Sequence, residues 1–301
     1  MLYWIWRLGV WLTNWLPRAW SLQGATWLGA TLYYLMPLRQ RVAHVNFAHV
    51  LDKPADDPAV ARTARRAFEN YARHLRDVML YPQMTLADLE ARVTIHNPHV
   101  FTEALAHGKG AIIVSAHFGN MDLPSAVFAL RYAPITLTGE TLRPQRLMDW
   151  LTRVRKRNRI HLFPYEQAAR RILEALKRNE MTAFLIDFGI THHFDIPTTT
   201  VSFFGTETQF PTSPAQLALL TGAPIILGHA HVDATGHIDV YTTPLIWITR
   251  QGDRHQILQT TMQEIARRME EFIRLYPEQW YIFRPMWKGL NLKVKDSRLV
   301  N

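Results

Sequence analysis

The chain contains no cysteine among its 301 residues. This absence excludes a disulfide framework, a thiolate zinc site and a cysteine nucleophile. Any group transfer must therefore be direct or use another nucleophile. No internal repeat or low-complexity tract stands out either. The length suffices for one large α/β domain or two small ones. With 48% hydrophobic and 20% charged residues, most of the chain is expected to fold.

Acidic residues are fewer than basic ones, with 25 Asp and Glu against 34 Lys and Arg, which gives a net charge of +9. A basic protein suits nucleic acid, an anionic membrane or an acidic protein partner. Tryptophans close to Arg7 and Arg18 favour a membrane interface over a DNA groove. We therefore expect membrane lipids with an anionic surface as partners, and no nucleic acid. The tryptophans concerned are Trp4, Trp6, Trp11 and Trp15.

The N-terminal segment lacks the features of a secretory signal, because no charged stretch precedes its apolar residues and Arg7 interrupts them. The uncharged run 19–38 approaches the length of a membrane span, but small and polar residues dilute it. We expect a helical hairpin, broken near Pro17, that lies in one leaflet. A full span and an aromatic helix packed on the protein's own core are the alternatives. This reading divides the chain into a hydrophobic membrane-associated region, 1–40, and an α/β domain, 41–301.

Strands alternate with helices beyond the N-terminal third, a pattern typical of a largely parallel sheet flanked by helices. Helical spacing first predicts helices at 42–50 and 60–81. Short apolar runs, several of them β-branched, predict strands at 111–114, 135–138, 160–163, 183–186 and 225–227. The intervening helices are expected at 123–130, 146–158, 166–178 and 213–221, and an amphipathic helix at 256–276.

Three ionisable residues follow predicted strands directly: His117, Glu140 and Asp187. Because reactive groups in open parallel sheets gather outside the carboxyl ends of the strands, these three are candidates for one crevice.

The run around His117 carries the strongest signal. A strand-to-helix turn bent at Gly119 would bring the carboxylate of Asp122 back to the imidazole, fix its tautomer and stabilise the imidazolium. His117 would then serve as a general base. Two simpler interpretations of these residues remain open. Asp122 or Asn120 could cap the following helix, and His117 could be a structural histidine.

The run GAIIVSAHFGNMD at 110–122 resembles the H-x-x-x-x-D/E signature of the lysophospholipid acyltransferase superfamily. More specifically, it looks like the bacterial lipid A late acyltransferase branch, which includes the phosphatidylinositol mannoside acyltransferases. The resemblance covers nearly the whole chain. It extends to RVAHVN at 41–46, TGETL at 138–142, the basic helix with Arg155, FLID at 184–187, VSFFG at 201–205, LALLTGAPII at 217–226 and the tail with Trp280, Arg284 and Trp287.

The resemblance implies an acyltransferase in which His117 is the base and Asp122 its partner, while Glu140, Arg155 and Asp187 line the site. It would move a fatty-acyl group from an acyl-thioester, either acyl-CoA or acyl carrier protein, to a hydroxyl of a membrane lipid or glycolipid. No cofactor or metal is expected. Backbone N–H groups near Gly119 and Asn120 could stabilise the oxyanion. The expected location is the cytoplasmic face of the plasma (inner) membrane, with peripheral or monotopic attachment.

Two other functions stay open at this point. Histidines two apart on a strand can share a face and bind a metal. His192, His193 and Asp195, or His229 and His231, could join His117 in a metal-dependent hydrolase. A non-catalytic lipid-binding module is the other alternative.

Overall fold

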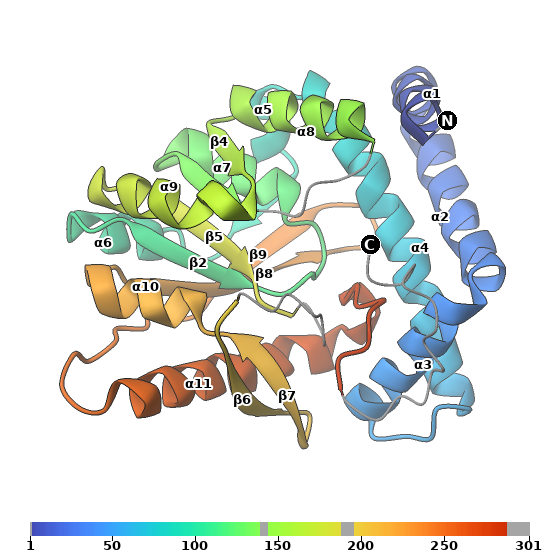
Figure 1. Cartoon of the computed structure of the whole chain (residues 1–301). Helices are drawn as coiled ribbons and strands as arrows, with labels where there is room; N and C mark the ends of the chain where they lie inside the picture. The colour runs from blue at the N-terminus through green and yellow to red at the C-terminus, as the bar shows by residue number, and fades with distance from the viewer. Residues whose placement is uncertain (1, 139–143, 188–195, 288–301) are drawn as a thin grey trace.

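The computed structural model describes residues 2–138, 144–187 and 196–287 (Figure 1). Its N-terminal part is helical, with α1 (Leu2–Trp15), α2 (Arg18–Leu35), α3 (Pro37–Leu51) and α4 (Pro58–Leu80). The break predicted near Pro17 is confirmed, since α1 ends two residues before this proline and α2 begins after it. Gly29 permits close packing of α2 on α4, because a Cβ there would lie 2.5 Å from the carbonyl oxygen of Phe68.

The predicted α/β fold with a mostly parallel central sheet is confirmed. The sheet of the described residues has the strand order β1-β9-β8-β2-β5-β3-β4. Strands β8, β2, β5, β3 and β4 run parallel to one another, while β9 is antiparallel to β8 and pairs in parallel with β1. The strands are β1 (Val93–Ile95), β2 (Ala111–Ser115), β3 (Ile135–Thr138), β4 (Ile160–Phe163), β5 (Met181–Leu185), β8 (Ile225–Val232) and β9 (Ile238–Thr242).

Helices cover both faces of this sheet (Figure 1). Strand β2 is buried on both faces, with Ile112 and Val114 in one apolar core and Ala111 and Ile113 in the other. This explains why its sequence is an unbroken apolar run and does not alternate. The remaining helices are α5 (Leu86–Glu90), α6 (His99–Ala106), α7 (Asp122–Arg131), α8 (Gln145–Arg157), α9 (Tyr165–Lys177), α10 (Ser213–Thr221) and α11 (Arg254–Leu275).

An antiparallel hairpin of β6 (Thr198–Phe203) and β7 (Thr206–Pro211) lies against α11. The side chain of Gln263 on α11 pairs with both backbone groups of Ser202 at 2.8 and 2.9 Å. Phe204 at φ 51° and Gly205 at φ 73° make the turn between the two strands. This hairpin and the outer strands β1 and β9 were not among the predicted elements.

No helix within the described ranges is both long enough and apolar enough to cross a membrane. Helix α1 nevertheless buries none of its residues fully. Its contact with the rest of the molecule includes Trp6, whose ring lies 5.6 Å from that of Trp150 on α8. Large apolar side chains of α1 and α2 stay exposed, among them Trp4, Trp11, Trp15, Trp20 and Trp27.

Candidate active site

The loop after β2 presents His117 at the edge of the sheet. Ser115 and Ala116 are buried, whereas the His117 side chain is 40% exposed. The chain then turns at Gly119, which has φ 59°. A Cβ at this position would lie 1.6 Å from the carbonyl oxygen of Ala230, so only glycine fits. The loop thus packs against β8 through Gly119, while the imidazole of His117 remains accessible.

Asp187 lies beside His117 because β2 and β5 are parallel neighbours in matching register. Ser115 is paired with Leu185, so the residues two positions further along meet beyond the strand ends. The carboxylate of Asp187 accepts a hydrogen bond from Nδ1 of His117 at 2.8 Å. It also accepts from the backbone N–H of His117, at 3.0 and 2.9 Å to its two oxygens.

The Asp187 carboxylate is fully buried, and its donors keep it charged. Trp280 contributes a further hydrogen bond, from its indole Nε1 at 2.7 Å. Burial by itself raises the pKa of Asp187. The charge of His117 and the hydrogen bonds from His117 and Trp280 outweigh this effect, so the pKa lies below its ordinary value. A buried anion next to Nδ1 can stabilise a positively charged imidazole ring.

The C-terminal segment fixes the backbone of the same loop. Tyr281 donates its N–H to the carbonyl of His117 at 2.7 Å, and Gly119 donates to the carbonyl of Gln279 at 2.9 Å. Trp280, which lies between Gln279 and Tyr281 in the chain, is fully buried and forms a β-bridge with Phe118. The sequence interpretation identified Trp280 as a tail residue only. Its contact with Asp187 spans 93 positions and leaves no local signal.

Asp122 does not take the place beside the ring that the sequence interpretation gave it. Arg155 on α8 donates to its carboxylate from Nε at 3.2 Å and from Nη2 at 2.8 Å. His74 on α4 lies 3.5 Å from the other oxygen. Asp122 is the first residue of α7, and its side chain contacts residues of α8 and α4. The carboxylate hydrogen-bonded to His117 is therefore that of Asp187.

Asp122, Arg155 and His74 form a second cluster, in which the charges of Asp122 and Arg155 stabilise each other. Burial raises the pKa of Asp122, but the effect of Arg155 and His74 is opposite and larger. The pKa of Asp122 therefore lies below its ordinary value. The charge of Asp122 in turn raises the pKa of Arg155. Burial lowers the pKa of His74 despite the neighbouring carboxylates. Arg155 was expected to line the site, and here it is an ion-pair partner of Asp122.

The N–H groups proposed as oxyanion donors are already in use within the protein. Gly119 donates to Gln279, and Asn120 donates to the carbonyl of Ala230 at 3.4 Å. The Asn120 side chain is buried. It donates to Asp77 at 3.1 Å and accepts from the N–H of Leu123 at 3.3 Å. Asn120 thus accepts an N–H group from the first turn of α7, although the N-cap residue of this helix is Met121.

Other predicted residues fall outside this geometry. Glu140, His192, His193 and Asp195 lie outside the described residues. In the part of the chain that is described, no group of three His, Asp or Glu side chains is arranged to hold a metal ion. The ring of His229 stacks on Phe272 with centroids 4.5 Å apart, and that of His231 lies 4.0 Å from Tyr276.

Comparison with known proteins adds to this geometry. The family model described as bacterial lipid A biosynthesis acyltransferase matches residues 1–289. The chain is 28% identical over 248 residues to a phosphatidylinositol mannoside acyltransferase of Mycolicibacterium smegmatis, which covers 80% of this chain and 77% of that protein. It is 27% identical over 252 residues to a protein of the same description from Mycobacterium tuberculosis, covering 80% of this chain and 75% of that protein. These matches confirm the resemblance found in the sequence.

Proposed function

The chain belongs to the bacterial lipid A biosynthesis acyltransferase family and is an acyltransferase, and from this premise we propose the reaction in detail. It moves a fatty-acyl group from an acyl-thioester, acyl-CoA or acyl carrier protein, to a hydroxyl group of a membrane glycolipid. His117 is the general base, and Asp187 orients it. The observation that carries this proposal is the 2.8 Å hydrogen bond between Nδ1 of an accessible imidazole and a fully buried carboxylate.

The proton transfers follow from that hydrogen bond. With a proton held on Nδ1 by Asp187, the basic lone pair of the ring is on Nε2. Nε2 takes the proton of the lipid hydroxyl as its oxygen attacks the thioester carbonyl carbon. The carbon–sulfur bond then breaks, the acyl group remains on the lipid as an ester, and the thiolate takes up the proton from His117. A base of this kind contributes about 10²- to 10⁴-fold to a rate.

Asp122 supports this site from a distance. We propose that its ion pair with Arg155 fixes the start of α7, and with it the loop that carries His117. The basic helix α8, which also carries Arg153, Lys156 and Arg157, would suit the acidic acyl donors.

The exposed aromatic surface of α1 and α2 is the proposed membrane contact. Trp15 and Trp20 are each 71% exposed, Trp27 is 67% exposed and Trp4 is 65% exposed. Indole rings of this kind bind at the level of lipid headgroups, and the net charge of +9 favours an anionic surface. We propose peripheral or monotopic attachment of residues 1–40 at the cytoplasmic face of the inner membrane.

The experiment is an acyl-transfer assay in which the released thiol is measured with a thiol reagent. The chain has no cysteine, so the signal comes only from the donor. His117→Ala should lower the rate about 10²- to 10⁴-fold while thermal stability and vesicle binding stay unchanged. His99→Ala is the matched control, since His99 is an exposed histidine at the start of α6. Wild-type activity in the folded His117→Ala protein would exclude this mechanism.

A further inference from the structure

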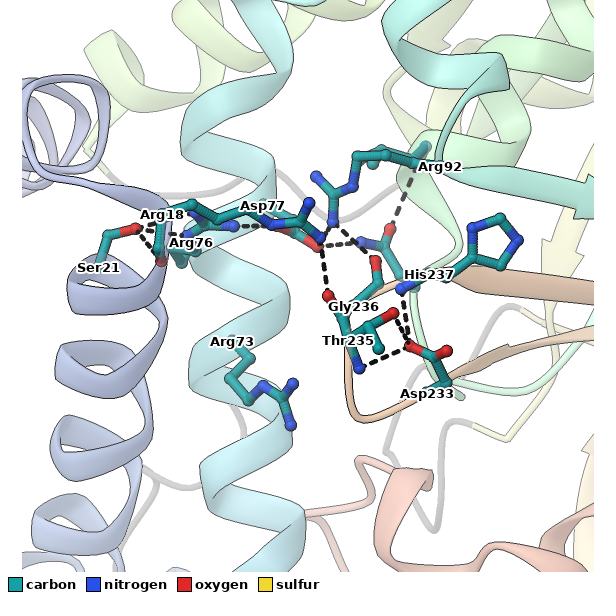
Figure 2. Close-up of polar contacts among 12 residues, drawn as sticks. Arg18, Ser21, Arg73, Arg76, Asp77, Arg92, Asp233, Thr235, Gly236 and His237 are labelled. Atoms are coloured by element: carbon teal, nitrogen blue, oxygen red, sulfur yellow. Dashed lines mark hydrogen bonds and ion pairs between the residues drawn. The ribbon is translucent and has the colours of Figure 1, made fainter.

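A small open pocket lies beside the loop that carries His117. Its polar side chains come from α2, α4, the segment before β1 and the turn that joins β8 to β9 (Figure 2). Four arginines and one carboxylate are among its lining residues: Arg18, Arg73, Arg76, Arg92 and Asp77. We refer to it as the arginine pocket. The four guanidinium groups against one carboxylate leave a surplus of three positive charges.

The single carboxylate is shared among several donors. Asp77 accepts from Arg76 at 2.9 Å, from Arg92 at 2.8 Å and from the side chain of Asn120 at 3.1 Å. Arg76 is 4% exposed, and its other hydrogen bonds go to the hydroxyl of Ser21. Nε of Arg92 is buried and has no acceptor among the described residues. Buried positive charge is costly unless an anion compensates it, and Asp77 compensates only part of it.

The other two arginines have no carboxylate partner in the described part of the chain. Arg18 donates to the carbonyl of Thr235 at 2.8 Å (Figure 2). Arg73 donates to the carbonyl of Ala234 at 3.3 Å. Both acceptors belong to the turn between β8 and β9. A backbone carbonyl carries no net charge, so these guanidinium groups keep most of their donors and all of their charge for a ligand.

The turn that faces the arginines is itself held rigidly. The carboxylate of Asp233 accepts from the N–H of Thr235 at 2.8 Å and from that of His237 at 2.9 Å. Gly236, at φ 81°, completes the turn, and its carbonyl accepts from Arg92 at 3.1 Å. These contacts fix the positions of the guanidinium groups. The carboxylate of Asp233 accepts its hydrogen bonds from its own turn. An anion entering the pocket would therefore meet a preformed site.

From these contacts we propose that the arginine pocket binds the phosphate group of an anionic membrane lipid. Planar guanidinium groups bind phosphate oxygens through paired hydrogen bonds, and several of them converge here. The position favours a lipid over free phosphate, because Arg18 begins α2 between the exposed Trp15 and Trp20. Indoles at the headgroup level would bring lipid phosphates to the height of Arg18.

The pocket also lies next to the proposed catalytic site, so this inference rests on the proposed function. Asn120 and Tyr281 line the pocket, and Tyr281 donates its N–H to the carbonyl of His117. A lipid held by its phosphate would thus have its headgroup close to the loop that carries the base. Binding there would position the acceptor and lower its KM, with a smaller effect on kcat.

The test is calorimetric titration of the whole protein with a short-chain phosphatidylglycerol below its micelle concentration. Inorganic phosphate and a short-chain diacylglycerol without phosphate are titrated in parallel. Arg73→Gln and Arg18→Gln should each weaken phosphatidylglycerol binding roughly tenfold, the loss expected for one charge-assisted hydrogen bond. Arg66→Gln is the matched control, because Arg66 is an exposed arginine of α4 and its loss should change Kd less than about twofold.

Each outcome has a definite meaning. Tighter binding of phosphatidylglycerol than of phosphate, lost in the Arg73 and Arg18 variants, supports a lipid site. Equal binding of both, with the same losses, supports a phosphate site but overturns the lipid as its source. Equal affinities of the Arg73, Arg18 and Arg66 variants overturn the pocket altogether. His117→Ala should bind phosphatidylglycerol normally, so lost transfer with retained binding separates this proposal from the proposed catalytic mechanism.

Discussion

Replacing Asp187 by Asn tests the proposed role of this carboxylate with a minimal change of shape. Three donors point at the two carboxylate oxygens, at distances of 2.7 to 3.0 Å. They are Nδ1 of His117, the backbone N–H of His117 and Nε1 of Trp280. Asparagine offers one oxygen and one NH₂ group, so at least one donor must face another donor. The negative charge that stabilises the imidazolium is lost at the same time.

The expected loss in kcat follows from these contacts. The same exchange in Ser-His-Asp enzymes lowers kcat by about 10⁴-fold, because the ring takes the wrong tautomer. We expect a loss of roughly 10²- to 10⁴-fold for Asp187→Asn, which corresponds to about 3 to 5.5 kcal/mol of transition-state stabilisation. One unsatisfied buried donor costs about 1–3 kcal/mol of folding free energy. The assay temperature should therefore lie well below the unfolding midpoint of the variant.

The assay is thiol release under saturating donor, with urea unfolding measured on the same preparations. Asp149→Asn is the control, because Asp149 is an exposed carboxylate of α8 whose contact is Gln145. A folded Asp187→Asn protein with wild-type kcat would refute the reasoning.

Three further predictions concern the same loop and its surroundings. Trp280→Phe removes the indole donor to Asp187 but keeps the packing, so kcat should fall about tenfold with little change in KM; a wild-type kcat would contradict this. Gly119→Ala forces a Cβ against the carbonyl of Ala230 at a positive φ, and urea unfolding should show at least about 2 kcal/mol of destabilisation, whereas an unchanged midpoint would argue against the turn geometry. Burial lowers the pKa of His229 to about 4. The unfolded state, with the higher pKa, then takes up the proton first as the pH falls, so this group should cost about 2 kcal/mol of stability between about pH 7 and about pH 5. Urea titrations should show this slope, and His229→Phe should flatten it; an unchanged slope would contradict the assignment.

Much of the fold was predictable because its strands are short runs rich in apolar or β-branched residues. Strand β2, whose five residues are all buried, is the clearest case. The strands predicted at 135–138 and 160–163 have the observed bounds of β3 (Ile135–Thr138) and β4 (Ile160–Phe163), although both are only partly buried. The outer strands β1 and β9 escaped prediction. β1 has only three residues, and β9 alternates buried and more exposed positions beside a polar turn.

The pairing of the site was only partly predictable. The ends of parallel strands bring His117 and Asp187 together, and the sequence interpretation placed both at the same edge of the sheet. It chose Asp122 as the partner because a turn at Gly119 could bring that carboxylate back to the ring, and because the H-x-x-x-x-D/E signature implies this pair. The register between Ser115 and Leu185 decides otherwise, and register is a long-range property that local patterns do not reveal.

The C-terminal segment could not have been placed from local sequence. Its contacts with the loop at 117–119 depend on how residues 279–281 pack between α4 and the sheet. In the sequence, Trp280 cannot be distinguished from any other buried aromatic residue, and its neighbours in the chain do not indicate a carboxylate partner. The same holds for the arginine pocket, whose charged residues come from α2, α4 and the segment between α5 and β1.

The central claim, that His117 and Asp187 act as one unit, is tested most directly by a double-mutant cycle on kcat. If the carboxylate acts only through the imidazole, the double variant His117→Ala/Asp187→Asn should transfer acyl groups no more slowly than His117→Ala alone. If the two losses multiply, Asp187 acts independently of His117, and the account is contradicted.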